Sequence, residues 1–197
     1  PEPTETSGSG AIPRDVADVF AGAGAMAPLL AALDWSRTPM GPPGGWPQSL
    51  RSAVSICLGA KYPIAIYWGH ELTLVYNEAW STIPGDKHPW ALGRPAAEVW
   101  PDIWHIVGPE FESALRGEAA WADDRLLPMQ RHGYLEETYF NYNLSPIRGE
   151  SGTVEGVFNA GLDTTSRVLG ERRNDLLREL AGAMADAVVV GDACTIA

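Results

Sequence analysis

Residues 134–162, YLEETYFNYNLSPIRGESGTVEGVFNAGL, decide the fold class of this chain. Two runs rich in aromatic and β-branched residues, 134–147 and 153–162, flank the short polar segment RGESG at 148–152. Such runs are typical of β-strands, and a short connection with glycine is typical of a hairpin. Parallel strands need a crossover of a dozen or more residues, so the sequence predicts that these two strands are antiparallel.

Three further strands are predicted upstream. A strand over about 121–129 is followed by a second turn at 131–133, and 63–69 and 71–77 show the apolar–polar alternation of a hairpin. Short helical segments are predicted between residues 77 and 121. The clearest is at 102–116, where apolar residues share one stripe. The predicted order is two strands, a helical middle and three more antiparallel strands. This order predicts an α+β domain with a five-stranded antiparallel sheet.

The chain divides by composition into four parts. Residues 1–12 are Pro, Glu, Thr, Ser and Gly and predict a solvated tail, and 13–59 predict an N-terminal helical extension. Residues 60–163 carry the predicted core, and 164–197 predict a charged C-terminal helix and linker. Within the extension, Pro47 suits the first turn of a helix that ends near residue 59.

The overall charge and the apolar pattern exclude several classes of partner. The 197 residues carry a net charge of −11, which repels nucleic acid and anionic lipid surfaces. No apolar run approaches the roughly 20 residues that span a bilayer, and the first residues lack the pattern of a signal peptide. Two distant cysteines form neither a disulfide framework nor a zinc cluster. We therefore expect a cytoplasmic protein without membrane insertion or nucleic-acid binding.

Motifs of catalysis and metal binding are missing from the sequence. It has no phosphate-binding Gly-Lys-Ser/Thr, no Gly-x-Ser-x-Gly elbow, and none of the boxes of a kinase core. Two carboxylate pairs, Asp123-Asp124 and Glu136-Glu137, fall on predicted strands, where adjacent side chains point to opposite faces. Neither pair can act on one substrate atom, so we expect no catalytic residue and no metal site in this chain.

A set of short motifs appears in a specific order along the chain. They are DWS at 34–36, WPQSLR at 46–51, LVYN at 74–77, EVWP at 98–101, GYLEE at 133–137, SPI at 145–147 and GVF at 156–158. Together they resemble the PAS sensor domains of bacterial signalling proteins, over about residues 34–173. The resemblance implies a PAS fold with helices on one face of the sheet. It also implies a sensory module that acts, in two-component-type signalling, on a histidine kinase-like output domain in the same polypeptide.

The PAS resemblance also implies where a ligand would bind. PAS domains hold flavin, haem or small metabolites between the inner sheet face and the middle helices, and Arg94 near that mouth could pair an acidic ligand or make a salt link at a helix start. The same side chains could instead pack closely and leave a ligand-free dimerisation module. The aromatic and aliphatic candidates for the cavity wall are Trp68, Tyr76, Trp80, Trp100, Ile103, Trp104, Val107, Phe140, Tyr142 and Phe158.

The sequence does not identify a cofactor. A photochemical flavin site needs a cysteine just before the long middle helix, and residues 86–104 contain none, which excludes cysteinyl-flavin chemistry. His105 lies where haem-binding PAS domains place their axial imidazole. A lone histidine on a helix is more often a surface or core residue, so we do not expect haem.

The C-terminal segment carries the expectations about signal transmission. Asp163 and Thr165 resemble the Asp-x-Thr signature that joins a PAS core to its outgoing helix, although the same residues also fit a plain helix cap. Leu169, Leu176 and Leu180 recur near heptad spacing, which favours a parallel two-chain coil and a homodimer through helical extensions. Packing of this helix against the leading helices is the competing explanation. Residues 181–197 resemble the first helix of a GAF domain.

Overall fold

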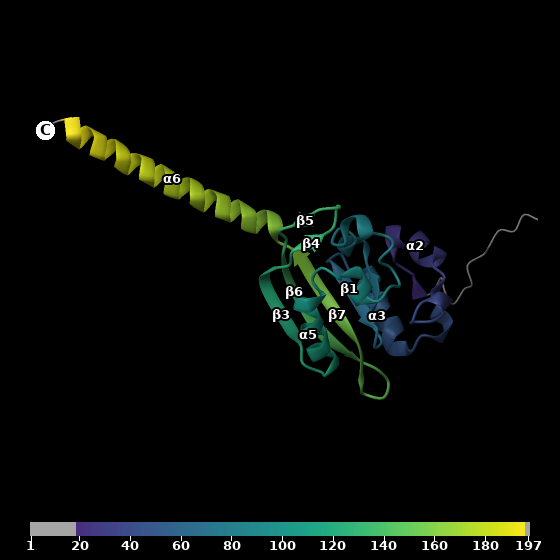
Figure 1. The fold of residues 1–197 in the computed structure, drawn as a ribbon. Helices are drawn as coiled ribbons and strands as arrows, with labels where there is room; N and C mark the ends of the chain where they lie inside the picture. Colours follow the sequence, from purple (N-terminus) through teal and green to yellow (C-terminus); the bar gives the residue numbers. More distant parts are fainter. Residues whose placement is uncertain (1–18, 196–197) are drawn as a thin grey trace, which may run out of the picture.

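The computed structural model describes residues 19–195, with side chains described as far as residue 184. A twisted sheet lies at the centre, short helices surround it, and one long helix projects from one corner (Figure 1). The predicted tail at 1–12 and the first residues of the predicted extension, 13–18, lie outside the described residues.

The central sheet has five strands, as predicted, in the order β2-β1-β7-β6-β3. All four pairings are antiparallel, including the pairing that joins β1 to β7 across most of the chain. The α+β architecture expected from residues 134–162 is therefore confirmed. The strands are β1 (Ile64–Trp68), β2 (Thr73–Tyr76), β3 (Ala120–Leu126), β6 (Tyr139–Arg148) and β7 (Val154–Asp163).

A second, smaller hairpin corrects the prediction between β3 and β6. The turn expected at 131–133 exists, but it joins β4 (Met129–Gln130) to β5 (Leu135–Glu136) in a separate two-stranded sheet. The predicted strand at 121–129 ends at Leu126, and Pro128, which has no N–H to donate, stands between β3 and β4. Two hydrogen bonds between Leu127 and Thr138 close the base of this hairpin.

Helices cover both faces of β1, whose five residues are all buried. The core helix α5 (Trp104–Leu115) lies over the inner face, which is the arrangement that the resemblance implied. The short helix α4 (Ala96–Val99) begins beside Leu72, next to the edge strand β2. The N-terminal extension covers the other face with α3 (Gln48–Gly59). Because Leu50, Val54 and Cys57 lie on one side of this helix, they form a single buried stripe against the sheet.

The remaining elements are short. Trp35 and Trp46 pack edge to face at 5.0 Å between ring centroids and hold the N-terminal segments together. The short elements are the helix α2 (Ala27–Ala32) and the 3-10 helices η1 (Gly24–Met26), η2 (Trp35–Arg37), η3 (Pro43–Gly45), η4 (Glu78–Trp80) and η5 (Gly85–Lys87).

Asn77 holds together the chain before β1 and the chain after β2. Its side-chain oxygen accepts hydrogen bonds from the backbone N–H groups of Ile64 and Trp80, and its amide donates to the carbonyls of Ala60 and Tyr62. The side chain is buried, and all four of its bonds are made to backbone groups. Asn77 thereby fixes the start of β1 relative to η4, which leads into the site described below.

The last helix, α6 (Thr165–Thr195), leaves the domain as a single rod (Figure 1). Leu176 and Leu180 are exposed on it, as are the residues around them. Packing against the leading helices, one of the two explanations for its apolar stripe, is therefore wrong. Among the described residues, no helix combines the length and the apolar character that crossing a bilayer requires.

Candidate functional site

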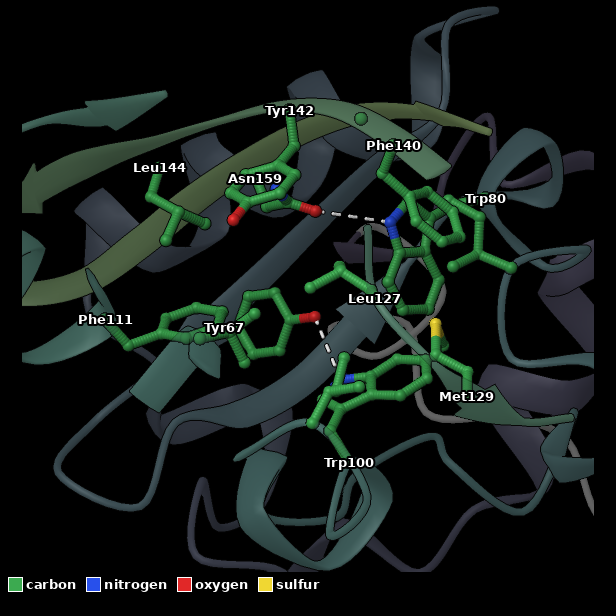
Figure 2. A pocket seen from close by; sticks show the side chains of 14 residues that line it. Tyr67, Trp80, Trp100, Phe111, Leu127, Met129, Phe140, Tyr142, Leu144 and Asn159 are labelled. Carbon is green, nitrogen blue, oxygen red and sulfur yellow. Dashed lines mark hydrogen bonds between the residues drawn. The ribbon is translucent and has the colours of Figure 1, made fainter. Parts of the chain in front are cut away.

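An aromatic cavity lies between the inner face of the sheet and the middle of the chain (Figure 2). Its floor comes from β1, β6 and β7, and its roof from η4, the start of α5, and the connection between β3 and β4. The residues that line it are Tyr67, Trp80, Ile83, Trp100, Ile103, Val107, Phe111, Leu127, Met129, Phe140, Tyr142, Leu144, Asn159 and Gly161.

The cavity has a volume of about 60 Å³. One water needs roughly 10–15 Å³ on this scale, so the space holds a few water-sized groups. Sites for drug-sized ligands are usually several times larger, on the order of 300 Å³ or more. In this arrangement the cavity suits a small molecule and would have to expand around a flavin or a haem.

Two indole–acceptor hydrogen bonds cross the cavity wall (Figure 2). Trp80 Nε1 donates to Asn159 Oδ1 at 3.3 Å, and Trp100 Nε1 donates to the Tyr67 hydroxyl oxygen at 3.2 Å. Burial raises the pKa of Tyr67, although the bond from Trp100 partly offsets this effect. Tyr67 therefore keeps its proton at neutral pH. Among the described hydrogen bonds the Tyr67 O–H has no acceptor, so it is a donor available to a ligand.

The structure brings together six of the eleven side chains that the sequence analysis selected as pocket candidates. They come from three separate parts of the chain, η4, the segment that runs from the end of α4 into α5, and β6, which the fold packs around one space. The six are Trp80, Trp100, Ile103, Val107, Phe140 and Tyr142.

Three candidates from the strands lie elsewhere. Trp68 points to the face opposite Tyr67 and covers Gly156, and Phe158 pairs with Ile66 on that same outer face. Tyr76 is on the inner face but lies behind Trp80, with ring centroids 4.8 Å apart, and its hydroxyl bonds to His88. The alternation of side chains along β1 was predicted correctly. The residues of its outer face, however, were assigned to the cavity in place of those of its inner face.

Two further candidates lie outside the cavity lining. Arg94 stacks on Trp90 and pairs with Glu98 at the wall of a separate surface cleft of about 780 Å³. Trp104 is half-buried on α5 and stacks on Phe111. His105, the residue considered for haem, is exposed on the same helix and does not line the cavity.

Sequence reasoning missed eight lining residues, and some of them had a usable signal. Leu144 continues the alternation of Phe140 and Tyr142 along β6, and Phe111 belongs to the stripe already recognised on the α5 segment. Tyr67 had no such signal, because both faces of β1 are buried. The others are Ile83, Leu127, Met129, Asn159 and Gly161.

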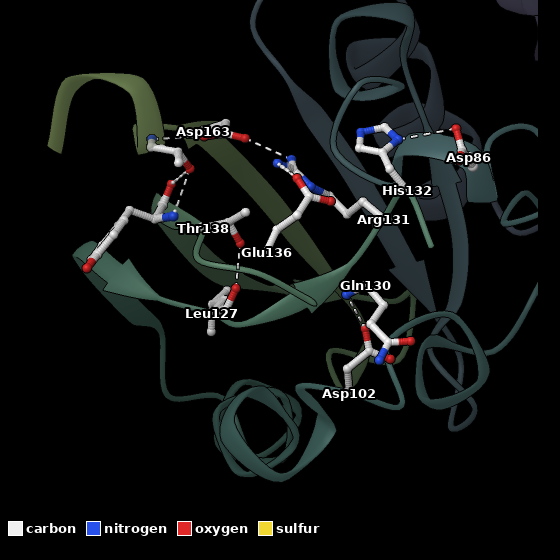
Figure 3. A network of polar contacts seen from close by, with 11 residues as sticks. Asp86, Asp102, Leu127, Gln130, Arg131, His132, Glu136, Thr138 and Asp163 are labelled. Atoms are coloured by element: carbon white, nitrogen blue, oxygen red, sulfur yellow. Dashed lines mark hydrogen bonds and ion pairs between the residues drawn. The ribbon is translucent and has the colours of Figure 1, made fainter. Parts of the chain in front are cut away.

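The β4–β5 hairpin connects this cavity to α6 (Figure 3). Met129 lines the cavity, and two residues later the Arg131 guanidinium pairs with Glu136 Oε2 at 3.0 Å and with Asp163 Oδ2 at 2.8 Å. The Arg131 side chain is only 10% exposed. Burial disfavours its charge, but the bonds to Glu136 and Asp163 outweigh this cost and raise the pKa of Arg131.

Asp163 and Thr165 join α6 to the sheet. Asp163 Oδ1 accepts the backbone N–H of Thr165 at 2.9 Å, and Thr165 Oγ1 accepts the N–H of Tyr139 in β6 at 2.9 Å. Burial opposes ionisation of Asp163, but its bonds with Thr165 and Arg131 lower the pKa of the carboxyl below its ordinary value. Asp163 thus accepts bonds from both the hairpin and the first turn of α6.

Two more ion pairs hold the base of α6. The Asp124 carboxylate accepts bonds from Arg167 and from the Thr164 hydroxyl, and Arg172 pairs with Glu137 at 3.0 Å. Asp124 stands at a bulge in β3 with a φ of +46°. The first two turns of α6 are therefore held by charges on β3 and on the chain just before β6.

No group of three or more His, Cys, Asp or Glu side chains is placed to hold a metal ion in the described part of the chain. Cys57 is buried in α3 with its thiol against the Ile64 carbonyl, and burial raises its pKa to about 12. The thiol therefore stays protonated and behaves as a small core residue.

Comparison with solved structures returned PAS domains and related sensors. A PAS domain of a protein from Colwellia psychrerythraea is 18% identical, with a TM-score of 0.45, over 59% of this chain and 98% of that one. The PAS domain of the histidine kinase ThkA is 22% identical, with a TM-score of 0.38, over 51% and 99%.

A longer protein also appears among the similar structures, an RNA-binding light-oxygen-voltage receptor. It is 23% identical with a TM-score of 0.46, and the match covers 62% of this chain but only 34% of the receptor. No curated protein sequence matches. A family model described as "PAS fold" matches residues 63–169, which is more than half of the 197 residues and contains the whole cavity. This chain therefore belongs to the PAS fold family.

Proposed function

We propose that this PAS domain is a sensory module whose cavity takes a small molecule and whose α6 carries the resulting change to an output domain. The observation that carries this proposal is the hairpin β4–β5. It provides Met129 to the cavity wall and Arg131 to the Asp163 carboxylate at the start of α6. A ligand that displaces Met129 therefore changes the position of the group that holds α6.

The cavity chemistry defines the class of ligand. Its wall is mostly aromatic and aliphatic, and no charged side chain is among its lining residues. Burying an unpaired charge there is costly, so the ligand is neutral. The Tyr67 hydroxyl provides one donor, which matches a single acceptor such as a carbonyl oxygen. We infer a small neutral molecule with an apolar body and one hydrogen-bond acceptor.

Binding can act on α6 only if one arrangement of the hairpin fits the ligand better than another. The hairpin is held from two sides. Gln130 N–H donates to Asp102 just before α5, at 2.8 Å, while Arg131 bonds to Asp163 on the α6 side. A shift between these two supports would alter the geometry at Asp163 and hence at the first turn of α6.

The output side of the proposal uses the apolar stripe of α6. Leu169, Leu176 and Leu180 are exposed on a helix that has few contacts with its own domain beyond the first turns. In proteins most of the stability of a helix comes from packing of its apolar face, and a stripe at heptad spacing is buried when two such helices pair. We propose a parallel homodimer through α6 that leads to a histidine kinase-like output domain in the same polypeptide, in two-component-type signalling.

A second candidate function is a dimerisation module without a ligand. The small volume of the cavity, about 60 Å³, favours it, because the aromatic side chains come close to filling the space by themselves. In this alternative the pairing of α6 remains, and the cavity has no part in signalling.

Binding of a matched pair of probes separates the two candidates. Acetophenone carries a phenyl body and one carbonyl acceptor, and toluene has nearly the same body without the acceptor. Titration calorimetry of the full chain should show acetophenone binding about fivefold more tightly, the value of one modest hydrogen bond. Tyr67→Phe removes the donor and should abolish the preference.

Two variants control for binding elsewhere. Val107→Phe places a ring in the cavity and should block both probes, whereas Ile56→Phe changes an exposed residue on α3 and should not. Binding of neither probe to the unmodified chain, with no small molecule detected by native mass spectrometry, would leave the dimerisation module as the function.

A further inference from the structure

Four arginines lie in the part of α6 whose side chains are described, and one differs from the others. Arg173 has no ion pair among the described residues. The other three each have an acidic partner: Arg167 pairs with Asp124 and Glu171, Arg172 with Glu137, and Arg178 with Asp175.

Arg173 also lies inside the apolar stripe. In one heptad register Leu169 and Leu176 take the d positions and Leu180 the a position, and Arg173 then takes the a position before Leu180. In the other apolar register, Leu177 and Met184 take the a positions, and Arg173 takes a d position. Both registers therefore place this guanidinium in the seam.

The surroundings of Arg173 provide no counter-charge. Together with Leu169, Leu176 and Leu177 it lines an open groove beside the hairpin, and the one acid among the lining residues is Glu137. That carboxylate is already paired with Arg172, which also lines the groove. The local charge of the groove is thus positive, although the chain as a whole carries −11.

We infer that Arg173 is a like-charge layer in the α6 seam that keeps the pairing of two copies weak. This inference rests on the proposed homodimer. The partner is a second copy, because it presents the same stripe at the same height along a parallel two-fold axis. The same symmetry places Arg173 opposite the partner's Arg173. Repulsion in this layer opposes association that Leu169, Leu176 and Leu180 favour.

Sedimentation equilibrium of the full chain measures the inferred effect. Arg173→Gln removes the charge without adding a large apolar surface and should tighten association about tenfold. The unmodified chain should also associate more tightly as NaCl rises from about 0.05 M to about 0.5 M, because salt screens the repulsion. Arg173→Gln should depend less on salt, because only the repulsion between the net charges of the two copies remains.

Arg178→Gln is the matched control, because Arg178 lies on the same helix outside both seams and pairs with Asp175. It should leave association unchanged. If Arg173→Gln associates no more tightly than the unmodified chain, or if both glutamine variants have the same effect, the inference is wrong.

A seam variant separates failure of this inference from failure of the proposed function. Leu176→Asp should abolish association in the Arg173→Gln background. If it does so while Arg173→Gln itself gives no gain, the homodimer stands and the role of Arg173 is wrong. If association is insensitive to Leu176→Asp, or no variant associates, pairing through α6 is wrong and this inference is overturned with it.

Discussion

Arg131 Nη1 donates to Asp163 Oδ2 across 2.8 Å and joins the wall of the cavity to the start of α6 (Figure 3). The two residues are 32 positions apart in the chain: Arg131 lies in the turn between β4 and β5, and Asp163 lies in the central sheet. Arg131 belongs to a hairpin that lines the cavity, and Asp163 ends the last strand of the core. This ion pair thus links the hairpin at the cavity wall to the residue that precedes α6.

Arg131→Gln should destabilise the domain by about 2–3 kcal/mol. The substitution leaves the largely buried Glu136 carboxylate and the partly exposed Asp163 carboxylate without their cation. The value lies below that of a fully buried pair because water still reaches Asp163. Chemical denaturation gives the measurement. Arg125→Gln changes an exposed arginine of β3 and should stay within about 0.5 kcal/mol of the unmodified chain.

The free energy of unfolding should fall in acid because the Asp163 carboxylate becomes protonated. The pKa of Asp163 is lowered in the folded chain relative to its ordinary value of 3.8. Between the lowered and the ordinary value the unfolded chain binds more protons, so unfolding becomes easier as pH falls through this window. The contribution is complete above pH 3.8. Denaturation between pH 5 and pH 2 should show a shallower acid loss for Asp163→Asn, and an unchanged slope would contradict the pairing.

Gly85→Ala should loosen the contact between η5 and the turn of the β4–β5 hairpin. Gly85 has a φ of +57°, and a Cβ there would lie 2.8 Å from the Arg131 backbone oxygen and from the His132 ring. We expect a loss of about 2–3 kcal/mol, measured by thermal unfolding. Gly22→Ala is the control, since Gly22 also has a positive φ but no atom near its added methyl. It should cost about 1 kcal/mol, and equal losses at both sites would mean that the close approach has no role.

Asn77→Ala should be among the most damaging single changes in the core, at about 3 kcal/mol or more. It leaves two backbone donors and two backbone acceptors without their partner at a buried position. Urea denaturation measures the loss. Asn174→Ala, at an exposed position of α6, should be nearly neutral, and a similarly mild effect at Asn77 would contradict the role given to its side chain.

The regular parts of the fold follow from local sequence. Alternation and short turns predict β1, β2 and β7 closely, because strands in a five-stranded antiparallel sheet keep one period along their length. The strand predicted over 134–147 is correct only from Tyr139 onward, because its first residues belong to β5. The apolar stripes predict α3 and α5 in the same way, because each keeps one helical period along its length. The turn of the β4–β5 hairpin was predicted, but its separate sheet was not, because two-residue strands are too short to show a period.

The site was only partly predictable, and the reasons are physical. One face of β6 is more buried than the other, so its alternation places Phe140 and Tyr142 together in the cavity lining. Both faces of β1 are buried, so its alternation does not indicate which face lies against the cavity. Trp68 was therefore chosen instead of Tyr67. The role of Arg131 depends on a partner that no local pattern reveals.

Amide hydrogen exchange in α6 tests whether the β4–β5 hairpin connects the cavity to this helix. The Val168 N–H donates to the Thr164 carbonyl in the first turn of α6, at 3.0 Å. Val107→Phe fills the cavity, and it should change the exchange rate at Val168 by about fivefold or more in the unmodified background. In the Arg131→Gln background the same filling should leave that rate unchanged. An equal change in both backgrounds, or no change in either, would show that the hairpin does not connect the cavity to α6.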